Sequence, residues 1–356
     1  MKNPLLETMG RRIRMALEMR GMSLEALSKA MNPSVTKQAI SKYEKGLAAP
    51  GSAVVLALSN ALNVAVDYFF RQQMVTISKI AFNNKSMLGA SAAKAINEVV
   101  RDHVERYLEA VQSAGVQIPS LSNGWPKWVA DEQAIVAMVK ELRQSWNIGE
   151  CAIGNVIEIL EQHGIIVLEI ADQGDFQGLS GWVDDTYPII VLNRSLNYES
   201  KRFTALHELG HILIAAEHDD KQMEKLCNIF ADELLISEAR LREMLGAKVK
   251  DLFINELENV RDSYGISIDV LLSKMQRMGV VSKSAYKSYL QQCSSDNNLR
   301  IRVEQSSRIK AETSHKFVNM VCRALSLDAI STSKAASLLN ISVMDLRMML
   351  TPLAES

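Results

Sequence analysis

The sequence has few aromatic residues and lacks any sign of a disulfide framework. Aromatics make up 6% of its 356 residues while 47% are hydrophobic, so its cores must rely mainly on aliphatic side chains, which favours helices. The cysteines are scattered and form no Cys-x-x-Cys pair, which predicts free thiols in a reducing cytoplasm. They are Cys151, Cys227, Cys293 and Cys322.

Long apolar runs are also missing. No stretch of about eighteen apolar residues occurs and the N-terminus lacks a signal-peptide pattern, so we expect a cytoplasmic protein with no membrane partner.

The net charge of −1 hides an asymmetry. Residues 1–73 hold ten Lys or Arg against five Asp or Glu, whereas residues 131–240 hold eight against twenty. A basic and an acidic region indicate different partners.

Residues 203–214 carry the most specific motif, His-Glu-x-x-His within an apolar run. On a helix, positions four apart share a face, so His207 and His211 can bind one metal ion. Glu208 is placed to act as general base toward a water activated by that ion, as in a zinc hydrolase. We expect Zn²⁺, although Mn²⁺ or Fe²⁺ also suits such ligands. Gly210 should let a neighbouring element approach closely.

A third protein ligand must come from the polar turn or the second predicted helix, over residues 222–236, that follow this motif. The residues alone leave Glu224, His218 and Asp219 open as that ligand. Cys227 lies one helical turn beyond Glu224, and we interpret it as a small buried filler rather than a ligand.

Two motifs, at residues 202–211 and 224–235, resemble those of the ImmA/IrrE family of bacterial metallopeptidases. The resemblance implies that Glu224, which opens the second motif, completes the metal site. It also implies cleavage of Xre-type repressors, which releases the genes that they control. The order of predicted elements over residues 131–240 is similar to that family throughout, so we expect a zincin-like peptidase domain there.

A small sheet is predicted ahead of the metal helix. Residues 165–170, 180–183 and 188–193 have the apolar, strand-forming character that it needs. Residues 189–193 could be an edge strand that binds substrate by strand addition, or a core strand. An oxyanion also needs a hydrogen-bond donor, for which the candidates are Tyr187, Tyr198 and His218.

Residues 1–73 predict a five-helix domain with a helix-turn-helix. Ser23 and Thr36 are typical N-caps for helices over residues 24–31 and 37–45. The domain resembles the Xre-type repressor family in its Leu27, its Thr-Lys-Gln-Ala-Ile-Ser and Glu-Lys-Gly segments, and its Pro50.

The Xre resemblance implies that the second motif helix enters the major groove of a double-stranded operator. Lys37, Gln38 and Lys42 are then candidates for contacts with base edges. The candidates for phosphate contacts are Thr36, Ser41 and Arg12, the last expected on the outer face of the first helix.

Residues 74–130 are expected to form a helical connector and linker. They include a short edge strand over residues 75–82 and a long helix over residues 91–113, which packs on the peptidase or pairs with a second copy. Residues 241–356 read as helical, and residues 330–342 loosely resemble another helix-turn-helix with a packing or dimerising role. The predicted fold class is therefore mostly α with a small β-sheet (α+β).

These patterns together predict a DNA-binding transcriptional regulator with a zinc metalloendopeptidase domain. Its expected partners are an operator, a protein substrate of the Xre-repressor type cleaved in trans or in cis, and a second copy in a homodimer. The alternative is a non-proteolytic repressor or antitoxin, paired with a toxin, whose metal domain senses or docks a partner. The complete set of His207, Glu208, His211 and Glu224 favours the enzyme.

Overall fold

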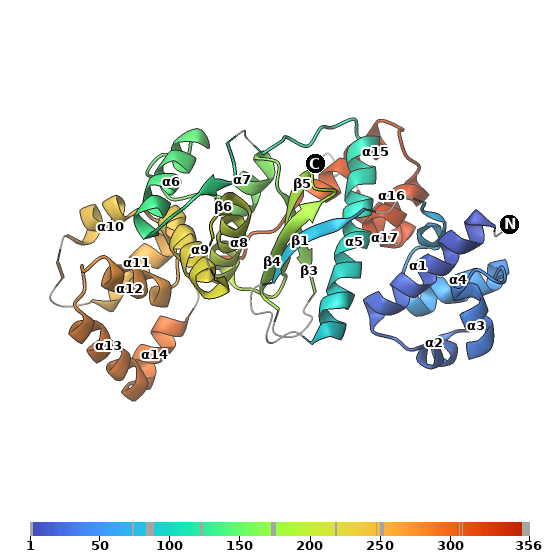
Figure 1. The fold of residues 1–356 in the computed structure, drawn as a ribbon, viewed down its shortest axis with the longest axis horizontal. Coiled ribbons are helices and arrows are strands. Elements are labelled where there is room, and N and C mark those ends of the chain that lie inside the picture. The colour runs from blue at the N-terminus through green and yellow to red at the C-terminus, as the bar shows by residue number, and fades with distance from the viewer. Residues whose placement is uncertain are drawn as a thin grey trace, which may run out of the picture.

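The computed structural model describes residues 3–350 except 73–74, 83–88, 122–123, 172–175, 218, 247, 250–252, 306 and 308. The described residues are mostly helical around a small central sheet, so the predicted α+β class is confirmed. The molecule is an elongated arch, with a helical head at one end, the sheet in the middle, and α13 and α14 at the other end (Figure 1). Among the described helices none is long and apolar enough to span a membrane.

The head has a core of its own, and its helices begin where capping residues predict. The Ser23 side chain accepts a hydrogen bond from the Ala26 N–H, and Thr36 accepts one from the Ala39 N–H. The fifth element is a 3₁₀-helix rather than an α-helix. The elements are α1 (Pro4–Arg20), α2 (Leu24–Ala30), α3 (Lys37–Glu44), α4 (Ser52–Leu62) and η1 (Val66–Phe70).

The central sheet has four strands in the order β1-β4-β5-β3. β3 and β5 run parallel, whereas β4 runs antiparallel to β5, and β1 antiparallel to β4. β1 confirms the predicted edge strand. β5 is paired on both sides, so an edge-strand role for residues 189–193 is wrong and the core-strand interpretation holds. The strands are β1 (Ile77–Phe82), β3 (Ile166–Ile170), β4 (Gly178–Val183) and β5 (Tyr187–Asn193).

Alternating side chains of the strands bury the two faces of the sheet in two different cores. Ile190 and Leu192 point to one core, shared with α6, α7, α8 and α9. Ile189 and Val191 point to the other, shared with α5, α15 and α16. The helices are α5 (Ala90–Ser113), α6 (Glu132–Ser145), α7 (Val156–Gln162), α8 (Tyr198–Leu213), α9 (Asp220–Leu235), α15 (Lys316–Ser326) and α16 (Thr332–Leu339).

The structure defines where α7 begins and on what α5 packs. α7 begins at Val156, because the Asn155 side chain caps it by accepting a hydrogen bond from the Glu158 N–H. The long helix α5 buries one face against the sheet and α15, so it packs on the body of the same chain.

The C-terminal region runs to the far end of the arch and then returns. Residues 238–304 extend the core that contains α8 and α9 toward the far end of the arch. The chain then returns and covers the face of the sheet that packs on α5 (Figure 1). The helix-turn-helix-like segment at residues 330–342 packs on α5. The elements are α10 (Glu238–Leu245), α11 (Ile254–Tyr264), α12 (Ile268–Arg277), α13 (Lys283–Ser295), α14 (Asn297–Glu304) and α17 (Val343–Met349), with a short pair β2 (Lys127–Trp128) and β6 (Ile214–Ala215).

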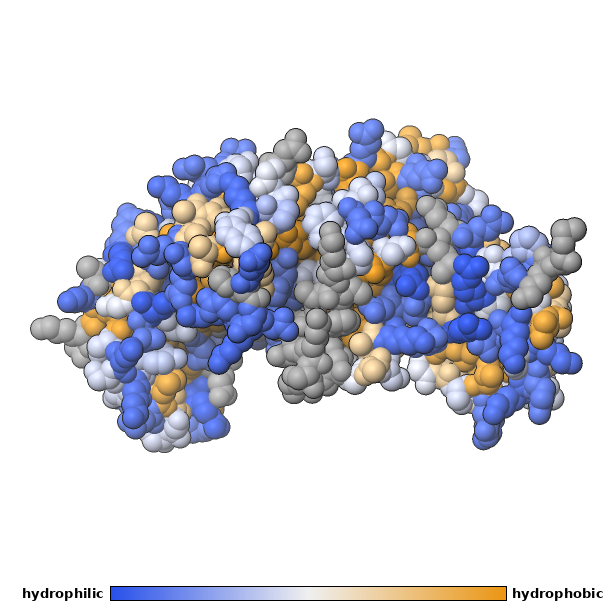
Figure 2. All heavy atoms as spheres, viewed as in Figure 1, coloured by the Kyte–Doolittle hydropathy of each residue, from blue (hydrophilic) through white to orange (hydrophobic). Residues whose placement is uncertain are grey.

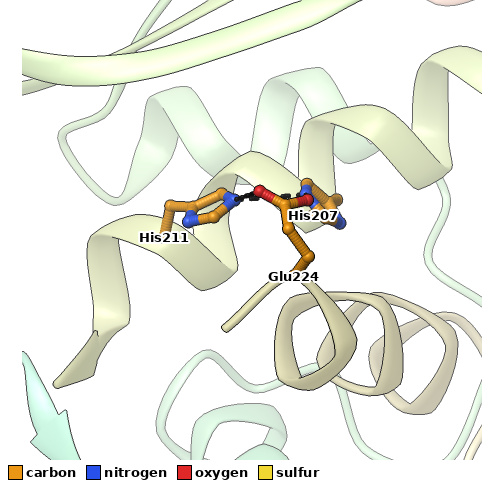
Figure 3. A group of neighbouring side chains, drawn as sticks. All are labelled: His207, His211 and Glu224. Carbon is orange, nitrogen blue, oxygen red and sulfur yellow. Dashed lines mark hydrogen bonds and ion pairs between the residues drawn. The ribbon is translucent and has the colours of Figure 1, made fainter. Parts of the chain in front are cut away.

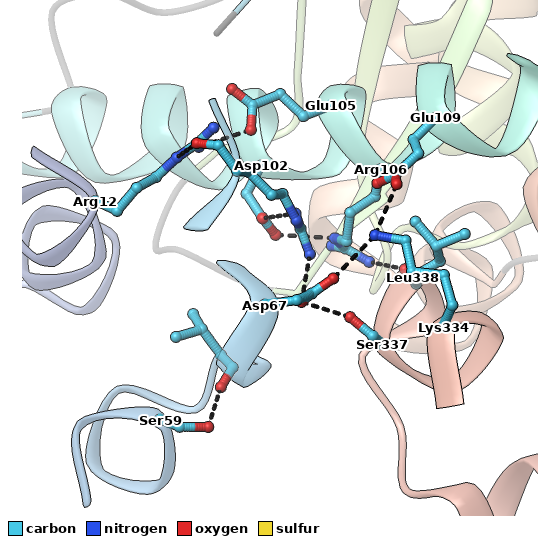
Figure 4. Close-up of polar contacts among 12 residues, drawn as sticks. Arg12, Ser59, Asp67, Asp102, Glu105, Arg106, Glu109, Lys334, Ser337 and Leu338 are labelled. Atoms are coloured by element: carbon cyan, nitrogen blue, oxygen red, sulfur yellow. Dashed lines mark hydrogen bonds and ion pairs between the residues drawn. The ribbon is translucent and has the colours of Figure 1, made fainter. Parts of the chain in front are cut away.

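The head docks on α5 through buried charges (Figure 4). The Arg12 side chain is 1% exposed; its Nη1 donates to Glu105 Oε2 at 2.6 Å and its Nε to the Arg71 carbonyl. Arg71 bonds Asp102 of α5, and Asp67 accepts hydrogen bonds from α16. The expectation that Arg12 lies on the outer face and contacts phosphate is therefore wrong, because its guanidinium holds the head against the body.

Candidate metal centre

Three side chains from α8 and α9 point toward one another between the two helices (Figure 3). One potential ligand atom from each of His207, His211 and Glu224 lies within 4.8 Å of the others. Glu224 Oε2 is 3.2 Å from His207 Nε2, and Glu224 Oε1 is 3.3 Å from His211 Nε2. The two Nε2 atoms are 3.2 Å apart. The helix places both imidazoles on one face, as their spacing of four predicts.

The tight packing of α8 against α9 brings Glu224 to the two histidines. A Cβ at Gly210 would lie 3.2 Å from the Cα, Cβ and Sγ atoms of Cys227, so the expected close approach at Gly210 is present. Cys227 is fully buried, and burial raises the pKa of its thiol. A neutral thiol at this contact agrees with the filler interpretation.

Asn228 orients the first histidine, and the sequence had not indicated this role. His207 Nδ1 lies 2.9 Å from Asn228 Oδ1. Because an amide oxygen only accepts, Nδ1 carries a proton, and Nε2 is the atom that faces Glu224 and His211. Asn228 follows Glu224 by four residues, so its place on the same helix face was the available signal.

Glu208 follows His207 on α8 and is fully buried. Its Oε2 accepts a hydrogen bond of 2.7 Å from the Ser180 hydroxyl on β4, and its Oε1 has no hydrogen-bond partner among the described residues. Burial raises the pKa of Glu208, against the opposing effects of His207, His211 and Ser180. A buried carboxylate with one unpartnered oxygen is suited to accept a proton from a water molecule.

Glu224 has the opposite electrostatic character. Hydrogen bonds from His207 and His211 lower the pKa of Glu224 to about 2, although its partial burial acts to raise it. Two imidazole nitrogens and one ionised carboxylate are the donors that Zn²⁺ takes in catalytic sites, and Glu208, whose Oε1 is unpartnered, interacts electrostatically with all three side chains. The residues present therefore fit a metal ion held by His207, His211 and Glu224.

Other sequence candidates lie elsewhere. Asp219 caps α9 by accepting a hydrogen bond from the Gln222 N–H. Tyr198 lies two turns before His207 and packs on Arg202, and Tyr187 packs into the core on the opposite face of the sheet from α8. None of these three joins the cluster. His218 lies outside the described residues.

A cleft of about 310 Å³ opens beside His211. One wall is β4 and the turn that follows it, and the other is the end of α8 with β6. Its lining residues are Pro126, Ser180, Gly181, Trp182, Asp185, His211, Ile212 and Ile214. The cleft therefore brings His211 and the Ser180 partner of Glu208 to one opening along β4.

Apart from Arg12, the candidate DNA-contacting residues lie on the free side of the head. Figure 1 places α3 away from α5, and Thr36, Lys37, Gln38 and Lys42 are exposed while Ser41 is half-buried. The visible surface of the head is mostly hydrophilic (Figure 2). Docking of the head on α5 thus leaves the second motif helix accessible.

Comparison with known proteins gives two matches along the chain. Residues 160–276 match the family described as the IrrE N-terminal-like domain of M78 peptidases, and residues 13–69 match a helix-turn-helix family. The chain joins an Xre-type helix-turn-helix domain to an IrrE-like domain. No solved structure matches the chain.

Two curated relatives are similar to the helix-turn-helix domain alone. They are uncharacterized HTH-type transcriptional regulators from Sinorhizobium medicae (strain WSM419) and Rhizobium meliloti (strain 1021), each 41% identical over 68 residues. The match covers 19% of this chain and 48% of each relative, so the chain spans about half the length of the relatives that it matches.

The IrrE-like match extends past residue 240 into α12, and a buried ion cluster explains why α12 belongs with the metal helices. Lys274 is fully buried, and its Nζ lies 2.9 Å from Asp232 Oδ1 and also bonds Glu233, both on α9. Arg277 adds two bonds of 2.8 Å to Asp232. These pairs fix α12 against the helix that carries Glu224.

Proposed function

We propose that the chain is a transcriptional regulator whose IrrE-like domain is a zinc-dependent endopeptidase. The observation that carries the proposal is the convergence of two imidazoles and a carboxylate next to a buried, half-partnered Glu208. An Xre-type repressor is the proposed substrate, in trans or in cis, because the family that the metal motifs resemble cleaves such repressors.

The proposed chemistry divides the work among these side chains. His207, His211 and Glu224 hold the metal, which would polarise the scissile carbonyl and activate a water molecule. Glu208 takes a proton from that water molecule as the water oxygen adds to the carbonyl carbon. Glu208 then gives the proton to the amine nitrogen as the carbon–nitrogen bond breaks, so one water is consumed for each bond cleaved. Ser180 positions Glu208 throughout.

The helix-turn-helix domain is proposed to bind double-stranded operator DNA with α3 in the major groove. The exposure of Lys37, Gln38 and Lys42 in the docked head supports this role, since no other part of the described chain covers them. The match to HTH-type regulators over the same segment supports it as well. A homodimer would present two such helices to an inverted repeat.

The test compares the wild-type chain with Glu208→Gln, co-expressed with an Xre-type repressor from the same genome. Loss of the general base should slow cleavage of the repressor, or of the chain itself, by about 10²–10⁴-fold. Metal content and operator binding should be unchanged, because Glu208 is not a proposed ligand. Equal cleavage, or equal absence of it, in both proteins under all inducing conditions would leave the metal domain as a sensor or docking platform.

A further inference from the structure

The outer edge of β4, beside the candidate metal centre, is covered by another part of the same chain. β1 pairs antiparallel with β4, with Ile77 opposite Val183 and Ser78 opposite Trp182. The other edge of β4 belongs to β5. β1 therefore takes the edge at which an incoming polypeptide strand would otherwise add to the sheet.

That edge lies next to the proposed catalytic base. β4 supplies Ser180, which bonds Glu208, and three of its residues line the cleft beside His211. Gly178 packs so closely that a Cβ there would lie 2.6 Å from Thr204 Cγ2 and 3.3 Å from Glu208 Oε1. A strand paired with β4 would thus pass along the candidate metal centre.

β1 is hydrogen-bonded to this edge at its start, and its pairing with β4 becomes irregular further along. The Thr76 N–H donates to Asp184 Oδ1 and the Asp184 N–H to the Thr76 carbonyl, both at 2.8 Å, and the Ser78 hydroxyl donates to Asp185 at 2.7 Å. The register then shifts between Ser78 and Ala81. Such an irregularity interrupts the ladder of backbone bonds, so the pairing next to Ser180 is the weaker part.

The start of β1 is also tied to the position of the head. η1 ends six residues before Thr76, and Arg71, in between, bonds Asp102 of α5 at 3.0 Å. The docked head therefore fixes the point from which β1 enters the sheet. Movement of the head away from α5 would pull on the strand that covers the edge of β4.

We propose that β1 occupies the substrate-binding edge of the IrrE-like domain, and that an extended polypeptide strand must displace it to reach the metal centre. The substrate then binds antiparallel to β4 through main-chain hydrogen bonds, with side chains entering the cleft. Undocking of the head favours this exchange. The inference rests on the proposed peptidase function.

Two variants of the full-length chain, both carrying Glu208→Gln, change the occupancy of this edge in opposite directions. Ser78→Pro removes a backbone N–H from β1 and weakens its pairing, whereas Ser78→Ala is the matched control that keeps the backbone intact. Ile77→Cys with Val183→Cys joins two directly opposite residues, whose spacing in a ladder suits a disulfide. The probe is a fluorescent peptide with the sequence of residues 75–82, and its binding is measured by anisotropy.

We expect Ser78→Pro to bind the peptide about tenfold more tightly than Ser78→Ala, because loss of a hydrogen bond raises the population with a free edge. The oxidised dicysteine chain should bind no peptide, and reduction should restore wild-type binding on the same sample. Equal binding by the oxidised and reduced chains would overturn the proposal, even if Ser78→Pro failed to fold.

Cleavage separates the two ideas. With Glu208 restored, Ser78→Pro should cleave an unfolded protein such as casein faster than Ser78→Ala does. A second outcome is peptide binding with the expected order of affinities while none of the variants cleaves casein. That result would support β1 as the occupant of the edge and contradict the proposed peptidase function.

Discussion

At the scale of single residues, metal affinity distinguishes ligands from the groups that orient them. His207→Ala and His211→Ala should lose the roughly one Zn²⁺ per chain that we expect in purified protein. Asn228→Ala should retain a site with about 10–100-fold weaker affinity, because the imidazole of His207 loses its orienting acceptor. Metal content after dialysis against a chelator measures both effects.

Asp219→Asn provides the control for these ligand variants. Asp219 caps α9, and asparagine caps a helix equally well, so this chain should keep its metal. Loss of metal in Asp219→Asn, together with full retention in Glu224→Ala, would contradict the proposed third ligand.

Gly210 offers a second test at the same scale. Gly210→Ala would push a methyl group against Cys227 at 3.2 Å and force α8 away from α9, which should destabilise the fold by about 1–3 kcal/mol. The displacement would also separate Glu224 from the histidines and lower metal affinity. Gly154→Ala, where nothing lies within 4 Å of the added methyl, should change the urea midpoint little.

At the scale of elements, α1 and α3 should respond differently to mutation. Gln38→Ala on the exposed α3 should cost about 1–3 kcal/mol of operator affinity and relax selectivity at one base pair. Arg12→Ala should leave operator affinity unchanged, because the Arg12 side chain is buried against α5. It should release the head from α5, since it leaves Glu105 buried without a partner. Operator binding by anisotropy and head mobility by hydrogen exchange check the two expectations.

α5 carries a histidine at the junction with the head, and this histidine should make stability depend on pH. Burial, with Arg106 and Arg194 nearby, lowers the pKa of His103 to about 3, and its ring packs on Phe317 at 5.1 Å. The unfolded chain takes up a proton near pH 6.5, so stability is complete above that pH and is lost as the pH falls toward 3. The loss should be about 1 kcal/mol between pH 6 and pH 5.

Urea unfolding at pH 7, 6 and 5 measures this dependence. His103→Gln cannot take up the proton and should show a flatter profile over the same range. Parallel profiles for the two chains would assign the acid sensitivity to the carboxylates of the junction instead.

Short sequence patterns, such as capping residues, predicted most of the helices and strands. They could not predict which distant segments pair with each other. Ser23 and Thr36 mark helix starts because a cap acts within three residues. The pairing of β1 with β4 joins residues about a hundred positions apart, and no local pattern specifies it. Arg12 shows the same limit, since a basic residue on a helix does not reveal a distant Glu105.

At the scale of the whole molecule, the candidate site depends on segments that lie far along the chain. The return segment places Glu312 against α8, where it pairs with the fully buried Arg202, and the Lys201 Nζ donates to the Glu312 carbonyl at 3.1 Å. The second face of the sheet is covered by α15 and α16, which follow that segment. Neither core of the body is complete without the segment that begins at Glu312.

This order has a consequence for synthesis on the ribosome. While Glu312 and the residues after it are still inside the exit tunnel, Arg202 lacks its carboxylate partner and one face of the sheet is uncovered, so the nascent chain exposes apolar surface. The helix-turn-helix head, whose contacts are local, can fold first. A cell therefore makes a complete helix-turn-helix head well before the domain that carries the candidate metal centre is complete.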